Sequence, residues 1–199
     1  FVVILKTMKK TSTSSVRIIS GAWRGRRIHF PAVPGVRPTH DRIRETLFNW
    51  LAGHVDQACC LDLFAGSGAL GFEALSRGAK KTVFVDQSRE VVQAIQSNLI
   101  RFQARGAAVI NSNVPFSRDL LEGVSFDIVF LDPPFGAEIF LSTIIWLKKN
   151  QLIDCQSTVY FELPLADQCL LVREGLEVTK QKHTRTICYG LLRVKDQFS

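Results

Sequence analysis

The sequence predicts an α/β protein with a mostly parallel sheet, a basic β-hairpin before the sheet and an antiparallel hairpin at its end. From residue 59 onward, apolar runs of strand length alternate with amphipathic runs of helix length, a pattern typical of a parallel sheet covered by helices on both faces. A glycine-rich turn follows the first of these strands. The last two apolar runs have no helix between them, so they predict an antiparallel hairpin.

The N-terminal segment is polar at first and then β-prone. Residues 1–15 are expected to be a disordered lead-in, and its first seven residues, which precede the single methionine Met8, need not be native. Residues 16–30 hold two short β-prone runs around a glycine-containing bend, which indicates a basic hairpin.

A helix is expected next, after a loop rich in proline and glycine over residues 31–38. Thr39 is a candidate N-cap for this helix, which is expected from His40 to Leu51. We therefore divide the chain into an N-terminal extension over 16–52 and a main domain over 53–199.

The main domain is predicted element by element from its apolar periodicity. Strands are expected at 59–64, 81–86, 107–111, 126–131 and 158–162, followed by a hairpin of 176–183 and 186–194. Helices are expected between them near 69–77, 88–103, 116–122 and 137–149.

Positive charge is concentrated at one end of the chain. The segment up to Arg44 holds ten of the 25 basic residues and one of the 18 acidic residues, so it carries +9 while the remainder carries −2. A near-neutral body with a basic arm favours a polyanionic partner bound through its phosphates. Arginine outnumbers lysine seven to three in this arm, and its planar fork suits phosphates and base edges.

Other bulk features exclude several classes of protein. The apolar run at residues 1–5 is too short for a membrane helix or a signal peptide, so a cytoplasmic protein without a membrane partner is expected. Five cysteines in no zinc-binding spacing indicate reduced thiols, and no metal site is expected.

The turn after the first strand matches a nucleotide-binding pattern. Gly66, Gly68 and Gly71 follow G-x-G-x-x-G, and Asp86 ends the next strand twenty residues after Gly66. The acidic residue indicates a ribose ligand, which both NAD and S-adenosylmethionine contain. Asp62, four residues before the first glycine, favours S-adenosylmethionine. A buried carboxylate is costly without a partner, and the ammonium group of this cofactor can supply one, whereas a pyrophosphate would repel it.

The strand at 126–131 leads directly into Asp132, Pro133, Pro134 and Phe135, at the edge of the sheet where ligands bind in open α/β folds. An exocyclic amine is methylated more easily when both of its N–H groups are held by acceptors. The Asp132 carboxylate can accept one and the Pro133 carbonyl the other, while consecutive prolines stiffen the backbone. Phe135 offers a stacking face for a base turned out of its stack, and Asp132 can take up the released proton.

Together these residues resemble the bacterial 16S ribosomal RNA guanine-N2 methyltransferases of the RsmD family, from about Arg17 to Val194. The segments that carry the resemblance are Arg17–Arg26 (RIISGAWRGR), Arg37–Leu51 (RPTHDRIRETLFNWL), Leu61–Gly71 (LDLFAGSGALG) and Asp132–Phe135 (DPPF). The second segment is the most specific, because many methyltransferases share the other motifs.

The resemblance implies a Rossmann-like, seven-stranded class I methyltransferase fold with an N-terminal extension that helps to hold RNA. It implies methylation at N2 of guanine 966, in the usual 16S numbering, within a small-subunit assembly intermediate that includes ribosomal proteins. The residues assigned to S-adenosylmethionine, whose product is S-adenosylhomocysteine, are Asp62, Phe64, Gly66, Gly68, Asp86 and Asn113. Asn113 stands where the wider superfamily commonly has an aspartate. Asp132, Pro133, Pro134 and Phe135 are assigned to the guanine.

The RNA is expected to contact the arm and the start of the helix. The candidate residues are Arg24, Arg26, Arg27, Arg37, Thr39, Arg42 and Arg44. His29 and His40 are interpreted as surface or packing residues, and Glu162 as a weak candidate for lining the pocket. A monomer is expected.

Three other functions compete with this interpretation. Adenine-N6 methylation of DNA or RNA would use the same amine chemistry. A non-catalytic RNA-binding assembly protein would keep the basic arm but would not need Asp62, Asp86 and Asp132 together. A nicotinamide-dependent dehydrogenase fits the glycine turn but leaves the motif at Asp132 without a role.

Overall fold

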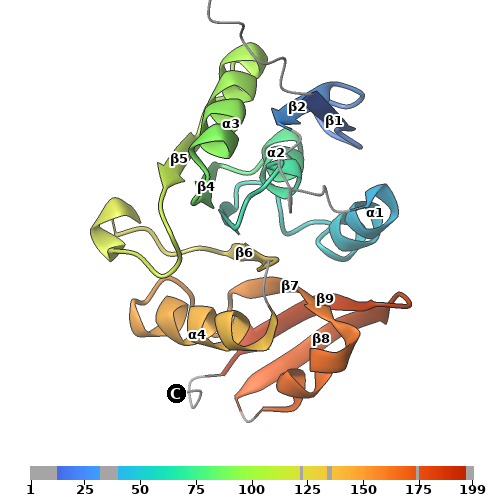
Figure 1. Cartoon of the computed structure of the whole chain (residues 1–199), viewed down its shortest axis with the longest axis vertical. Helices are drawn as coiled ribbons and strands as arrows, with labels where there is room; N and C mark the ends of the chain where they lie inside the picture. Colours follow the sequence, from blue (N-terminus) through green and yellow to red (C-terminus); the bar gives the residue numbers. More distant parts are fainter. Residues whose placement is uncertain (1–12, 32–39, 122, 134–135, 174, 196–199) are drawn as a thin grey trace, which may run out of the picture.

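The computed structural model describes residues 13–31, 40–121, 123–133, 136–173 and 175–195. They form a central sheet with helices on both faces and a small separate hairpin (Figure 1). Within these ranges, no helix combines the length and the apolar character needed to cross a membrane.

The central sheet has seven strands in the order β5-β4-β3-β6-β7-β9-β8. Neighbours from β5 to β7 are parallel, whereas β9 pairs antiparallel with both β7 and β8. The strands are β3 (Cys59–Leu63), β4 (Lys81–Asp86), β5 (Ala107–Asn111), β6 (Ile128–Leu131), β7 (Thr158–Pro164), β8 (Leu176–His183) and β9 (Ile187–Val194). The predicted α/β class and the terminal antiparallel hairpin are confirmed.

Among the described residues, three α-helices cover one face of the sheet and one covers the other. The helices are α1 (Asp41–Trp50), α2 (Ala69–Ser76), α3 (Arg89–Phe102) and α4 (Gly136–Lys149). On one face, α1 and α2 pack on residues such as Cys60, Phe130 and Tyr160, and α3 packs beside α2. On the other, α4 packs on residues such as Leu131 and Phe161. Apolar side chains therefore alternate between two buried faces along each central strand.

The N-terminal hairpin pairs β1 (Thr13–Arg17) with β2 (Arg27–Pro31) in antiparallel register. In Figure 1 it lies beside α2 and α3. Its apolar side chains, including Ile18, Ile28 and Phe30, join one core cluster with the inner faces of these helices. The hairpin is thus packed onto the α/β body.

Several features differ from the sequence-based expectation. The N-cap position of α1 is His40 rather than Thr39, and its side chain makes no capping hydrogen bond. A 3₁₀ helix that was not expected, Leu165–Val172, follows β7.

β1 begins at Thr13, inside the segment expected to be a disordered lead-in. The predicted helix at 116–122 is only a short 3₁₀ helix, Arg118–Leu121. There the Ser117 hydroxyl accepts the N–H of Asp119, and serine side chains that bond to nearby backbone in this way compete with a regular α-helix.

Candidate active site

The parallel strands end at one edge of the sheet, called here the carboxyl edge, and the predicted cofactor residues lie along it. After β3 the chain turns sharply into α2, and three residues of this turn have left-handed backbone: Phe64 (φ 60°), Gly66 (φ 52°) and Gly68 (φ 73°). A non-glycine residue in this conformation carries strain of about 1–3 kcal/mol, which occurs most often at functional sites. The backbone of Phe64 is therefore held in a strained conformation at the start of the glycine loop.

Asp86 links this loop to the loop after β4. One carboxylate oxygen accepts the N–H of Gly66 at 2.9 Å and the other accepts the N–H of Ser88 at 2.8 Å. The side chain is half-buried, and each oxygen keeps acceptor capacity after one hydrogen bond. The position fits an acceptor for a ribose hydroxyl while also holding the glycine loop in place.

Asp62 is buried within β3, on the side that faces α2. Its carboxylate accepts the N–H of Gly71 at 2.9 Å. Removal from water is the main cause that raises the pKa of Asp62 to about 8, and the charge of Asp86 raises it further. A cation beside this carboxylate would offset that cost, so the site fits the ammonium group of the predicted cofactor.

Gly71 explains why the third glycine of the motif is needed. A Cβ atom at this position would lie 2.3 Å from the ring of Phe84 and 2.9 Å from the Asp62 carboxylate. The absence of a side chain thus lets α2 approach the sheet closely enough for its backbone to reach Asp62.

Asp132 directly follows β6, the strand next to β3. Burial raises its pKa well above the ordinary value, and the charges of Glu162 and Asp62 add to this effect. Pro133 is buried. Pro134 and Phe135 lie outside the described residues. The structure thus brings Asp132 to the same edge of the sheet as Asp62 and Asp86.

Asn113 lies just beyond the end of β5, at the outer end of the same edge, and is exposed. The neighbouring Asn111 donates from its amide to the backbone carbonyls of Asp86 and Gln87, at 3.0 and 2.9 Å. Sequence reasoning missed Asn111, which joins the loop after β4 to the region assigned to adenine.

Glu162, interpreted from the sequence as a weak candidate for lining the pocket, lies on β7, next to the strand that leads into Asp132. Sequence reasoning missed Tyr160, which contacts it. The hydroxyl of the buried Tyr160 donates to Glu162 at 2.8 Å, and His40, at the start of α1, is close enough to lower the pKa of Glu162. The alternation of side chains along β7, which places Tyr160 and Glu162 on the same face, is the signal that would have found Tyr160.

The structure separates the predicted RNA-binding residues into two groups. Arg42 is exposed in the first turn of α1, near the carboxyl edge. Arg24, Arg26 and Arg27 are exposed at the bend of the N-terminal hairpin, which packs on the C-terminal ends of α2 and α3. Arg37 and Thr39 lie outside the described residues.

Arg44 was expected to bind RNA, but its side chain is not accessible to RNA in this structure. Its side chain is fully buried; it donates to the carbonyl of Arg17 at 2.8 Å and to the Asp41 carboxylate at 2.7 Å. Its guanidinium also lies 3.8 Å from the buried carboxylate of Glu73. Arg44 therefore ties α1 to the N-terminal hairpin and to α2.

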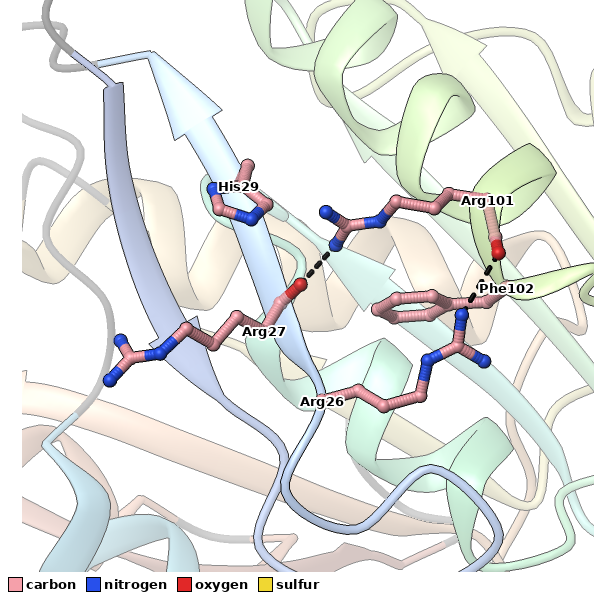
Figure 2. A pocket seen from close by; sticks show the side chains of 5 residues that line it. All are labelled: Arg26, Arg27, His29, Arg101 and Phe102. Carbon is pink, nitrogen blue, oxygen red and sulfur yellow. Dashed lines mark hydrogen bonds between the residues drawn. The ribbon is translucent and has the colours of Figure 1, made fainter.

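A basic hollow on the surface lies where β2 meets the end of α3. Its lining residues are Arg26, Arg27, His29, Arg101 and Phe102. Figure 2 shows the Arg26 side chain reaching the backbone carbonyl of Arg101, with its guanidinium 4.2 Å from the centre of the Phe102 ring. Arg101 in turn donates to the carbonyl of Arg27. Because α3 runs from the end of β4 back to the start of β5, this hollow is at the opposite edge of the sheet from Asp132.

Nothing in the described part of the chain forms a metal site: no group of three or more histidine, cysteine or acidic side chains is placed to hold an ion. The five cysteines are free thiols.

Comparison with known proteins defines the family. A family model described as "Conserved hypothetical protein 95" matches residues 16–193. The protein named ribosomal RNA small subunit methyltransferase D in Escherichia coli K12 is 39% identical over 193 residues, covering 97% of both chains. The chain belongs to the RsmD family. Its relative of the same name in Haemophilus influenzae is 41% identical, covering 92% of this chain and 98% of the relative.

Solved structures show that this family's fold is a methyltransferase fold. A structure from Escherichia coli, described as a candidate methyltransferase, is 38% identical and superposes with a TM-score of 0.82, covering 92% of this chain and 100% of the other. A ribosomal protein L11 methylase from Lactobacillus delbrueckii shares the fold at 18% identity, with a TM-score of 0.65 over 81% of this chain and 83% of its own. The seven-stranded class I methyltransferase fold expected of this RsmD family member is confirmed.

Proposed function

We propose that this protein transfers the methyl group of S-adenosylmethionine to the exocyclic N2 of a guanine in 16S ribosomal RNA. The observation that carries the proposal is the position of Asp132 at the end of β6, one strand from Asp62 and the glycine loop. The near full-length similarity with relatives named ribosomal RNA small subunit methyltransferase D supports the same proposal.

The cofactor brings an activated methyl group on a positively charged sulfur, and the proposed transfer uses no metal. Asp62 would hold the ammonium group of its methionine part, and Asp86 the ribose hydroxyls. Phe64, Gly66 and Gly68 form the turn beside it, and Asn113 is assigned to the adenine. Asp62 supports this assignment best, because a buried carboxylate with a raised pKa is stabilised by a nearby cation.

Asp132 would act directly on the target amine. Its carboxylate accepts one N–H, the Pro133 carbonyl accepts the other, and Phe135 stacks on the base. A carboxylate whose pKa is raised by burial binds a proton more readily, which suits Asp132 to take up the proton released as the N–C bond forms. Most of the rate enhancement would come from holding the amine in line with the methyl group.

The proposed substrate is a folded RNA within a small-subunit particle that contains ribosomal proteins, in the bacterial cytoplasm, and the protein acts on it as a monomer. Arg42 at the carboxyl edge would meet RNA beside the target base. Arg24, Arg26 and Arg27 would meet phosphates farther away.

The experiment that tests this function is transfer of labelled methyl groups. The protein is incubated with labelled S-adenosylmethionine and small-subunit particles lacking the modification, beside naked 16S RNA and DNA, and the methylated nucleoside is identified after digestion. The Asp132→Ala variant is compared with Asp119→Ala, which alters an exposed carboxylate elsewhere. Binding of S-adenosylhomocysteine is measured for each variant.

N2-methylguanosine is the expected product, and it should disappear with Asp132→Ala while cofactor binding and the Asp119→Ala activity persist. N6-methyladenosine would overturn the choice of base. Cofactor binding without transfer to any substrate would favour a non-catalytic RNA-binding protein.

A further inference from the structure

Glu162 is the acidic side chain nearest in the sheet to Asp132. The parallel ladder between β6 and β7 pairs Leu131 with Phe161, so Asp132 and Glu162 follow at the same level on neighbouring strands, which lie about 4.8 Å apart. The electrostatic influence of Glu162 on Asp132 agrees with this placement. Two carboxyl groups thus stand side by side where the target base is proposed to bind.

The Glu162 carboxylate is held in a defined orientation. The hydroxyl of Tyr160 donates to its Oε2 atom at 2.8 Å, and Tyr160 itself is fully buried in the core against α1. The hydrogen bond from Tyr160 thereby fixes one carboxylate oxygen of Glu162. The Glu162 side chain is only half-buried. Its other oxygen keeps its full acceptor capacity.

Of the two carboxyl groups, Glu162 is the one better suited to remain charged. Burial raises the pKa of both. For Glu162, the hydrogen bond from Tyr160 and the nearby His40 act in the opposite direction. The Tyr160 hydroxyl and His40 therefore favour the charged form of Glu162, against the effect of burial.

The pairing edges of the two purines differ next to their amino groups. In guanine, the amine at N2 stands beside N1–H, which is a second donor, whereas in adenine the amine at N6 stands beside N1, which is an acceptor. A carboxylate next to the amine-binding residue therefore attracts guanine and repels adenine. Recognition of a turned-out base through hydrogen bonds to this edge is a general device.

We propose that Glu162 selects guanine by accepting the N1–H of the base whose N2 amine is held by Asp132. This inference rests on the proposed function and assigns its base specificity to one side chain. Tyr160 acts as a positioning residue, because it orients Glu162 without touching the base.

The sharpest test changes the hydrogen-bonding character of N1 and leaves the amine in place. Small-subunit particles are reconstituted with 2,6-diaminopurine at the target position, which keeps the 2-amino group but presents an acceptor at N1 and an amine in place of the O6 carbonyl. Because the change at position 6 is the same for every variant, the effect of Glu162 on N1 is read from the difference between variants. The ratio of kcat/KM for guanine to that for diaminopurine is measured for the unaltered protein, Glu162→Gln, Tyr160→Phe and Glu138→Gln. Glu138 is an exposed glutamate on α4 and provides a matched control.

The unaltered protein and Glu138→Gln should prefer guanine by about tenfold or more, the size expected for discrimination by hydrogen bonds to a base edge. Glu162→Gln should lose most of this preference, because its amide can donate to the N1 acceptor of diaminopurine. Tyr160→Phe should show a smaller loss. S-adenosylhomocysteine binding and the thermal unfolding midpoint should stay close to those of the unaltered protein.

An equal loss of activity on both bases in Glu162→Gln, with the ratio unchanged, would overturn the role of Glu162 and leave the proposed function intact. The same conclusion follows if the unaltered protein does not distinguish the two bases. If the unaltered protein methylates neither base, the proposed function fails and this inference fails with it.

Discussion

The Glu73 carboxylate on α2 accepts the backbone N–H of Ile19 in the N-terminal hairpin at 2.8 Å, across 54 positions of sequence. The same carboxylate accepts the N–H of Ser20 at 2.9 Å and an N–H of Arg77 at 2.8 Å, and it lies 3.8 Å from Arg44. Glu73 is fully buried. One acidic side chain therefore fastens the hairpin to the α/β body and balances the charge of a buried arginine.

Replacement of Glu73 by alanine should destabilise the protein strongly. Arg44 would keep its contact with Asp41 but lose its buried carboxylate partner, and two backbone N–H groups of the hairpin would lose their acceptor. Removing one partner of a buried charged network typically costs about 3–5 kcal/mol. Urea unfolding monitored by circular dichroism measures the free energy of unfolding. Glu45→Ala, which removes an exposed glutamate from α1, serves as the control and should change stability by less than about 0.5 kcal/mol. Equal effects of the two substitutions would contradict this role.

Gly71→Ala should disturb both packing and cofactor binding. The added methyl group would overlap Phe84 and press on the Asp62 carboxylate, and overpacking of this kind costs about 1–3 kcal/mol. A weaker affinity for S-adenosylhomocysteine, measured by calorimetry, should accompany the lower stability. Gly53→Ala offers a contrast: its Cβ would meet no atom within 4 Å, so it should lower stability through its positive φ alone and leave cofactor affinity unchanged.

The pH dependence of stability should carry the signature of Asp62. Its pKa is about 8 in the folded protein and 3.8 in its ordinary state, so the folded protein retains a proton that the unfolded chain releases. Stability contributed by this group is complete below about pH 4 and is lost as the pH rises to about 8, with an upper limit of about 6 kcal/mol.

Asp62→Asn should therefore become more stable relative to the unaltered protein between pH 4 and pH 8, as measured by thermal unfolding without cofactor. Its affinity for the cofactor should fall, because the amide carries no charge. The exposed Asp56→Asn should show neither change. A constant difference between Asp62→Asn and the unaltered protein across this range would rule out the raised pKa.

The salt dependence of RNA affinity should distinguish arginines of the N-terminal segment that contact phosphates from those that do not. Arg24→Ala removes an exposed charge, and it should weaken RNA binding and reduce the slope of log affinity against log salt by about one for each phosphate that is no longer neutralised. Arg44→Met should leave that slope unchanged and lower stability, because Arg44 is buried. Filter binding over a series of salt concentrations measures the slope, and a reduced slope for Arg44→Met would show that this residue does reach RNA.

The sequence allowed most of the fold to be predicted because its apolar periodicity is clear. β4 and β5 have the predicted bounds, and α3 and α4 lie within one residue of theirs. Asp62 and Asp86 could be placed together for a similar reason, since neighbouring parallel strands bring their ends to one edge. The length of the helix predicted at 116–122 was overestimated. The hydrogen bond between the Ser117 hydroxyl and the backbone of Asp119 competes with a regular helix, and apolar periodicity does not reveal it.

The remaining features depend on contacts between distant segments. The charge of Arg44 could be counted from the sequence, but its burial depends on Glu73, which lies on another helix. Glu162 could be placed in a strand, but its proximity to Asp132 depends on the register between β6 and β7. The hollow at Arg26 and Arg101 requires the hairpin to lie along α3.

The distance between the basic hollow at Arg26 and the carboxyl edge determines how long an RNA must be to contact both. The hollow lies at the far end of α3, whose 14 residues span about 20 Å, while Asp132 and Glu162 stand at the other end of the sheet. An RNA that engages both must have a footprint that extends well beyond one flipped nucleotide. If the hairpin arginines meet phosphates as proposed, the RNA would place a phosphate about one helix length from the methylated guanine.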